Sequence, residues 1–163
     1  MRKYEISTFY PKIDTSLMEL EHDESLAVTL KNFYKLADTF GRDCIEMYTD
    51  GSKSIGAEMV GASVYIPHLR KSINHKLPAE TSIFTAKAWA LLQAAELSLI
   101  SNRSNSIIYT DSLSVIKALV NKTDSNNNHI ILQLKSSLYN SYAKGAVIKI
   151  AWVPAHKGIP DLC

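Results

Sequence analysis

The tripeptide Tyr-Thr-Asp occurs twice, at residues 48–50 and 109–111, and each copy follows a short segment of strand-like apolar character. Such segments predict strands, so each copy predicts a strand that ends at an aspartate. In α/β sheets, ligands bind beyond the carboxyl ends of the strands. If the two strands are parallel neighbours, Asp50 and Asp111 converge, and two converging carboxylates need a cation between them. Oxygen ligands select Mg²⁺ or Mn²⁺, so the repeat predicts a divalent metal site.

The order of predicted elements after residue 41 indicates an α/β fold with a mixed sheet. Three strands joined by short turns come first and predict an antiparallel meander, with one turn over residues 51–56. Ser82 and Ser112 are predicted helix N-caps, and Gly145 is predicted to end the last helix. The predicted strands are 45–50, 60–66, 70–77, 106–110 and 147–153, and the predicted helices are 81–101, 113–120 and 129–142.

The first 40 residues differ from the rest of the chain in charge. They carry five basic and seven acidic side chains, whereas residues 41–163 carry 13 basic and nine acidic ones, a net charge of +4. We therefore divide the chain into a linker or appendage over residues 1–40, with a possible helix over 25–40, and one domain over residues 41–163. A mildly basic domain permits an anionic partner, and an ordinary solvated surface explains the same charge equally well.

Composition restricts the cellular setting. No run of 18 apolar residues is present, so no membrane partner is expected. The amino-terminal segment lacks the apolar core of a secretory signal, and Cys44 and Cys163 show neither a disulfide framework nor zinc spacing. We expect an intracellular protein, with cytoplasm and nucleus both open.

A third segment, Trp152-Val-Pro-Ala-His156, follows the last predicted strand. A loop histidine beside a carboxylate cluster can move protons or assist product release. Structural interpretations compete, because Asp-Gly is a common turn pair, an aspartate before serine can cap a helix, and a lone surface histidine often has no role. The two aspartates together, each following an apolar strand, favour a functional site.

Four segments in this order resemble the type 1 ribonuclease H domain, in the version attached to reverse transcriptases of non-LTR retrotransposons. The resemblance covers about residues 42–160, and residues 10–16 resemble the connector between polymerase and nuclease in such elements. The four segments are Thr49-Asp-Gly-Ser52, Ser82-Ile-Phe-Thr-Ala-Lys-Ala-Trp-Ala-Leu91, Thr110-Asp-Ser112 and Trp152-Val-Pro-Ala-His-Lys-Gly-Ile-Pro160.

The resemblance implies a ribonuclease H-like fold, with a five-stranded mixed sheet of three antiparallel and two parallel strands and helices on both faces. It implies hydrolysis of the RNA strand of RNA–DNA hybrids by two Mg²⁺ (or Mn²⁺) ions that four carboxylates hold. The hybrid is expected to be recognised by shape, through 2′-hydroxyls and phosphates. Asp50 and Asp111 match the first and third family carboxylates, and His156 matches the family's loop histidine. The expected substrate contacts are Gly51, Ser52 and Ser112.

Two features depart from the family pattern. Lys87 stands where the family has a glutamate, its second carboxylate. Because an ammonium cannot coordinate Mg²⁺, we expect Lys87 to point toward Asp50 and Asp111, to form an ion pair in place of the cation and to weaken metal binding. The sequence given also stops at Cys163, before the family's last helix and fourth carboxylate, so that helix is expected to be missing.

Three functional interpretations stay open. The first is a metal-dependent ribonuclease H of impaired activity. The second is an inactive module that still binds hybrid or double-stranded nucleic acid, and the third is a non-functional fragment of a mobile element. A structural protein unrelated to nucleic acid is a distant fourth. In the first case the expected partner is an RNA–DNA hybrid, and in the second it is a hybrid or another nucleic-acid duplex. A reverse-transcriptase polymerase domain of the parent element is a further candidate partner.

Overall fold

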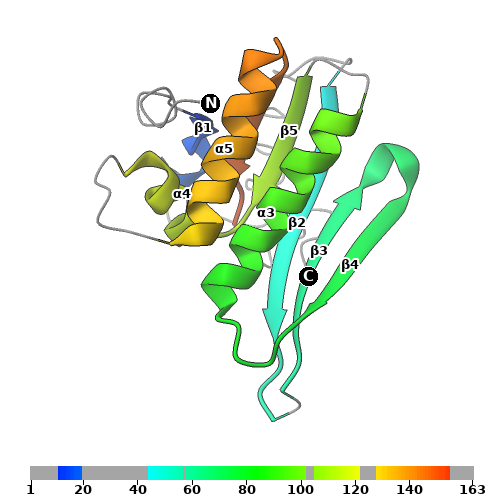
Figure 1. Ribbon diagram of the computed structural model, residues 1–163, viewed down its shortest axis with the longest axis vertical. Helices are drawn as coiled ribbons and strands as arrows, with labels where there is room; N and C mark the ends of the chain where they lie inside the picture. The colour runs from blue at the N-terminus through cyan, green and yellow to red at the C-terminus, as the bar shows by residue number, and fades with distance from the viewer. Residues whose placement is uncertain (1–10, 20–43, 57, 102–104, 122–127, 155–163) are drawn as a thin grey trace.

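The computed structural model describes residues 11–19, 44–56, 58–101, 105–121 and 128–154. They form one sheet of order β1-β6-β5-β2-β3-β4, with helices laid across it (Figure 1). The strands are β1 (Lys12–Asp14), β2 (Cys44–Lys53), β3 (Val60–Ile66), β4 (Lys71–Leu77), β5 (Asn105–Thr110) and β6 (Val147–Trp152). The helices are α3 (Ile83–Ile100), α4 (Leu113–Val120) and α5 (His129–Ala143), with short 3₁₀ helices η1 (Ser16–Glu19) and η2 (Pro67–Leu69).

The sheet is mixed, as predicted. Strands β2, β3 and β4 form an antiparallel meander, and β2, β5 and β6 are parallel neighbours. This arrangement confirms the α/β class and the predicted combination of antiparallel and parallel strands in one sheet. Parallel strands must be joined by crossover connections, which are usually helical. The helices α3, α4 and α5 form these crossovers and therefore lie beside the sheet.

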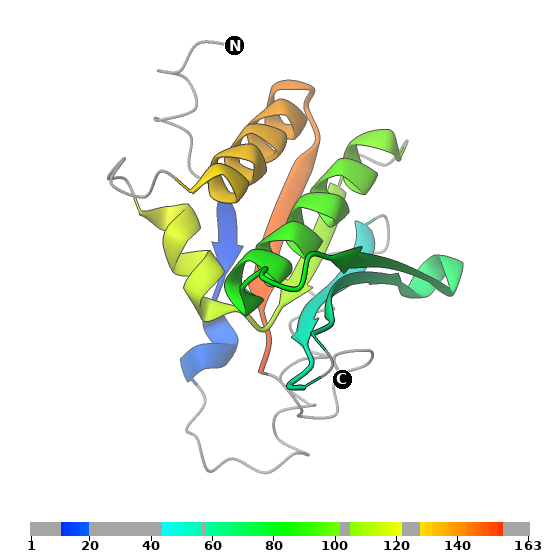
Figure 2. The same ribbon diagram turned by 60° about the horizontal axis from the view of Figure 1, so that its bottom comes forward.

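The sheet has six strands among the described residues instead of the predicted five. The additional strand, β1, pairs in parallel with β6 through Lys12↔Lys149 and the next two residue pairs, and Figure 2 shows the two strands side by side. Three residues are too few to give a period-two pattern, so the strand has no sequence signal of its own. Ile13 packs against the main core, which stabilises β1 at the edge of the sheet.

Part of the predicted linker packs against the domain. Strand β1 belongs to the sheet, and Leu17 of η1 is buried with Tyr109 and Val153. The predicted helix over residues 25–40 lies outside the described residues, and the domain boundary at residue 41 stays a prediction.

The helices begin and end where local sequence signals predict. The Ser82 hydroxyl accepts a hydrogen bond from the Thr85 amide (3.1 Å), and the Ser112 hydroxyl accepts one from the Val115 amide (3.3 Å). Both serines therefore cap free amides in the first turn of their helices. Gly145 has a φ of +81° just after α5, the left-handed conformation that suits a glycine at this position.

Two apolar clusters lie on opposite faces of the sheet. The main cluster packs α3, α4 and α5 onto one face and includes Met47, Leu91, Ile108 and Leu134. The second cluster, on the other face, joins η1 to side chains of β2, β5 and β6, namely Leu17, Tyr48, Ile107, Tyr109, Ala151 and Val153. Successive residues of a strand face opposite sides, so each central strand contributes to both clusters.

Helix α3 is the central helix of the main core. By length and composition alone, it is also the one helix within the described ranges that is apolar enough to cross a membrane. Its fully buried residues include Ala88, Leu91 and Ala95, and it packs against β2, β3 and α5. Packing of this kind explains the apolar composition as that of a core helix.

Strand β2 is longer than predicted. A turn was expected over residues 51–56, but β2 pairs with β3 as far as Lys53↔Val60, so the turn begins at Ser54. The antiparallel ladder supplies partners for these additional backbone groups, which outweighs the turn preference of Asp-Gly. Asp50 therefore lies within its strand and not at the end of it, which corrects the sequence-based placement.

Candidate functional site

The two Tyr-Thr-Asp copies lie side by side in adjacent strands. Tyr48 of β2 is the register partner of Tyr109 in β5, and the two rings stack with centroids 4.8 Å apart and an interplanar angle of 22°. Because the strands are parallel, the residues that follow each tyrosine advance in the same direction. The predicted parallel pairing is confirmed. Asp50 and Asp111 each lie two residues past Tyr48↔Tyr109, the last pair of the β2–β5 ladder, where Asp50 still belongs to β2 and Asp111 follows the end of β5.

The threonines of both copies hold the ends of these strands in place. The buried Thr49 hydroxyl donates to the Tyr109 carbonyl oxygen at 2.8 Å. The hydroxyl of Thr110, also buried, accepts a hydrogen bond from the Ser112 amide at 3.1 Å. These contacts position the backbone next to each aspartate.

Asp50 is partly buried in β2. Its Oδ1 accepts a hydrogen bond from the Gly51 amide at 2.9 Å. Met47 faces the helices, so the alternation of the strand turns Gly51 toward α3 and Asp50 toward the other face. The prediction that the Asp50 and Asp111 carboxylates share one cation stays a prediction, although their strands are now known to be neighbours.

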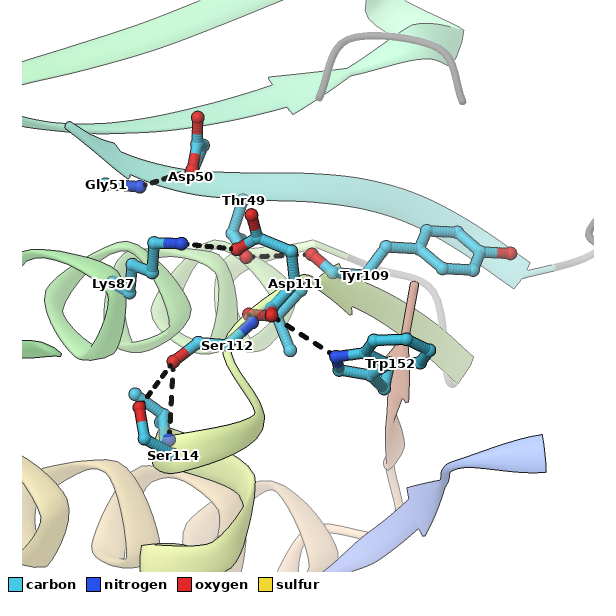
Figure 3. Close-up of polar contacts among 11 residues, drawn as sticks. Thr49, Asp50, Gly51, Lys87, Tyr109, Asp111, Ser112, Ser114 and Trp152 are labelled. Carbon is cyan, nitrogen blue, oxygen red and sulfur yellow. Dashed lines mark hydrogen bonds and ion pairs between the residues drawn. The ribbon is translucent and has the colours of Figure 1, made fainter. Parts of the chain in front are cut away.

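Lys87 on α3 reaches Asp111. Its Nζ lies 2.9 Å from Asp111 Oδ1, and the two side chains are 22% and 11% exposed (Figure 3). The ion pair that the sequence predicted for Lys87 is therefore present at Asp111. The Trp152 indole Nε1 donates to the Asp111 carbonyl oxygen at 3.2 Å, which anchors this residue from β6.

Gly51 allows α3 to approach β2 next to this ion pair. A Cβ on Gly51 would lie 2.6 Å from the Lys87 amide nitrogen and 2.9 Å from Lys87 Cγ. Both distances are below normal contact, so only glycine permits this approach without a backbone shift. The family resemblance predicted that Gly51 contacts the substrate, and this stays a prediction. The buried position of Gly51 against Lys87 also gives it a packing role, which the motif alone did not indicate.

The described residues do not fit the two divalent cations of the family's chemistry. The described ranges contain no group of three or more His, Cys, Asp or Glu side chains that could hold a metal ion. The Asp111 Oδ1 atom, which the family resemblance assigns to metal binding, already accepts a hydrogen bond from the Lys87 ammonium.

The remaining predicted site residues have different positions. Ser52 is exposed on β2, whereas Ser112 is 5% exposed and its hydroxyl caps α4. A hydroxyl that is engaged in a cap is poorly placed to meet a substrate, and substrate binding by these serines stays a prediction. His156 lies outside the described residues.

A cluster of ionisable groups lies behind the site, on the face opposite α3. The Tyr109 hydroxyl makes a long hydrogen bond of 3.5 Å to Glu46 Oε1. Burial raises the pKa of Glu46, and the hydrogen bond from Tyr109 opposes that effect. Burial, together with the Glu46 carboxylate, raises the pKa of the Cys44 thiol to about 11 and also raises the pKa of Tyr109. Sequence reasoning missed this cluster, because its members come from two strands.

The fold and the paired aspartates together define the class of protein. An antiparallel meander continued by parallel strands, with one aspartate within β2 and another directly after β5, is the arrangement of ribonuclease H-like α/β proteins. Residues 42–162 match the protein family described as RNase H, and this match covers most of the chain, so the chain belongs to the RNase H family. A search of curated proteins found no match. The family is one of ribonucleases that act on RNA–DNA hybrids, generally with Mg²⁺, and the match supports a type 1 domain.

Proposed function

We propose that this chain is an RNA–DNA hybrid ribonuclease domain of retrotransposon origin whose hydrolytic activity Lys87 impairs. The observation that carries the proposal is the ion pair between Lys87 Nζ and Asp111 Oδ1, at 2.9 Å. It places a positive charge on one of the two aspartates that the family resemblance assigns to metal binding. A cation and a nearby ammonium repel each other, so Mg²⁺ or Mn²⁺ would bind weakly here.

The origin in a retrotransposon rests on the sequence resemblance of the four motifs and of residues 10–16. Strand β1, which is part of that connector-like segment, pairs with β6, so the segment is joined to the nuclease fold. Sequencing upstream of the coding region tests this part of the proposal. An in-frame reverse-transcriptase polymerase region supports it, and an unrelated upstream domain contradicts it.

The ion pair also favours a second candidate function, an inactive module that binds nucleic acid. The residues from 41 onward carry a net charge of +4, which suits a polyanionic partner. In this case the domain would hold hybrid or double-stranded nucleic acid, inside the cell, without cleaving it. The two candidates differ in one measurable property, the rate of hydrolysis.

A cleavage assay on a labelled RNA–DNA hybrid tests the proposal. We expect slow cleavage by the unmodified chain in Mg²⁺ or Mn²⁺, and faster cleavage, by about tenfold or more, by the Lys87→Glu variant, because a carboxylate replaces a repelling charge. The Lys87→Glu, Asp111→Asn double variant is the matched control and should be inert. Equal rates for the unmodified chain and Lys87→Glu would show that Lys87 is no impairment. No cleavage by either chain, with hybrid binding retained, would favour the binding module.

A further inference from the structure

The chain between β1 and β2 has to cross the sheet. Strands β1, β6, β5 and β2 are parallel to one another. Asp14, the last residue of β1, is the register partner of Ala151, near the carboxyl end of β6. Cys44, the first residue of β2, is the partner of Asn105, the first residue of β5. Residues 15–43 therefore leave at the carboxyl ends of the strands and return to their amino ends, which makes them a crossover connection.

The direction of this crossover selects the face of the sheet that it crosses. From β2 through β5 to β6 the chain advances one way across the sheet, and the helices α3, α4 and α5 pack onto one face (Figure 1). From β1 to β2 the chain goes back the other way, past β6 and β5. Crossovers between parallel strands are right-handed in about 98% of cases, so a crossover of the same hand in the reverse direction lies on the opposite face.

The ends of the crossover that the structure describes lie on that opposite face. Helix η1 follows β1 directly, and its Leu17 is buried in the second cluster, with Tyr109 and Val153. At the other end, Cys44 is partly buried against the same cluster. The chain therefore leaves and rejoins the described structure on one face, in agreement with the handedness rule.

This second face is more deeply buried than its described neighbours explain. Ile107, Tyr109 and Ala151 are at most 1% exposed. In the described part of the chain, the members of their cluster that lie outside the strands are Leu17 and Val153. Two aliphatic side chains are too few to cover apolar groups from three strands, so a further element is needed on this face.

We propose that residues 25–40 of the same chain are that element, docked on the second face as an amphipathic helix. Apolar residues at helical spacing share one side of this segment, namely Leu26, Leu30, Phe33, Ala37 and Phe40. Sixteen helical residues span about 24 Å, and the six residues of β5 span about 20 Å, so one helix suffices for the return along the strands. The inference goes beyond the proposed function, because it makes the connector-like amino-terminal part an integral layer of the nuclease fold.

Photo-crosslinking identifies the surface that the segment contacts. Phe33 is replaced by the photoreactive analogue benzoylphenylalanine in the full chain, and the crosslinked residues are identified by mass spectrometry. We expect crosslinks within one molecule to side chains of the second cluster on β2, β5 and β6. The same analogue at Lys35, on the opposite side of the helix, should not give these crosslinks. Crosslinks from position 33 to α3, α4 or α5, crosslinks only between two copies of the chain, or none in the folded chain would overturn the proposal.

A stability comparison tests the same contact without a chemical probe. Leu30→Asp places a charge on the apolar side of the segment, and its midpoint temperature of thermal unfolding should fall by about 5 °C or more. Val28→Asp makes a similar change on the opposite side and should stay within about 2 °C of the unmodified chain. If Leu30→Asp does not fold, Leu30→Ala takes its place, with Val28→Ala as its control. Equal midpoints for the two folded variants would overturn the proposal, and neither measurement involves nucleic acid or its cleavage.

Discussion

Gly51 in β2 lies so close to the backbone of α3 at Lys87 that a side chain would not fit between them. A Cβ at Gly51 would lie 2.6 Å from the Lys87 amide nitrogen and 2.8 Å from the Ala86 carbonyl carbon. These are backbone atoms of a core helix, so they cannot move aside as the end of a flexible side chain can. The contact fixes where α3 crosses β2, and with it the direction in which Lys87 leaves the helix toward Asp111.

Replacing Gly51 with alanine should therefore destabilise the domain. Inserting a methyl group into a packed contact costs about 1–3 kcal/mol, because the helix or the strand must shift. Urea unfolding measures this change in the free energy of unfolding. Gly61→Ala is the matched control, because a Cβ at Gly61 would meet its nearest atoms at an ordinary 3.5 Å. Equal stability of the two variants would refute the steric role of Gly51.

The hydroxyl of Thr49 should contribute to the pairing of the two central strands. Thr49→Val keeps the shape of the side chain but removes the 2.8 Å hydrogen bond to the Tyr109 carbonyl oxygen. We expect a loss of about 1 kcal/mol in the free energy of unfolding, the usual contribution of a buried hydrogen bond. Thr49→Ser retains the hydroxyl and can keep the hydrogen bond, so its free energy of unfolding should fall by less than that of Thr49→Val. A Thr49→Val variant as stable as the unmodified chain would contradict this role.

The stability of the domain should depend on pH through Glu46. Burial raises the pKa of Glu46 above its ordinary value of 4.5, so the folded state holds this proton more tightly than the unfolded state does. The stabilisation from the bound proton is complete below pH 4.5 and is lost as the pH rises through the raised pKa. Glu46→Gln, which cannot ionise, should therefore be more stable than the unmodified chain at pH 7, and the difference should shrink toward pH 4.5. Denaturation at several pH values checks this, and a difference that does not vary with pH would rule it out.

Binding of an RNA–DNA hybrid should weaken as the salt concentration rises. The net charge of +4 over residues 41–163 can neutralise only a few phosphates, and each contributes about −0.9 to the slope of log K against log salt concentration. We expect a slope between about −1 and −4, measured by fluorescence anisotropy from 50 to 200 mM salt, the range over which such effects are large. A slope near zero would indicate a partner that is recognised without phosphate contacts.

Local signals in the sequence determined most of the elements and several of their ends. The serines at positions 82 and 112 cap helices, and the glycine at 145 adopts a left-handed conformation, because each of these effects acts within a few residues of backbone. The repeated Tyr-Thr-Asp segments predicted two strands, each followed by or ending in an aspartate, because each copy follows a short apolar segment. The family resemblance then drew attention to Lys87, at a position where a carboxylate was expected.

The tertiary structure decided the features that depend on contacts between distant residues. The continuation of β2 past Asp50 depends on its ladder with β3, and the pairing of β1 depends on a free edge of β6. Neither partner is adjacent in sequence, so no local pattern records the pairing. The approach of α3 to Gly51 and the 2.9 Å ion pair between Lys87 and Asp111 likewise required the helix to be placed on the sheet. The sequence by itself thus indicated which charged residues form the site. The packing of α3 against β2 decided that the Lys87 ammonium contacts the Asp111 carboxylate.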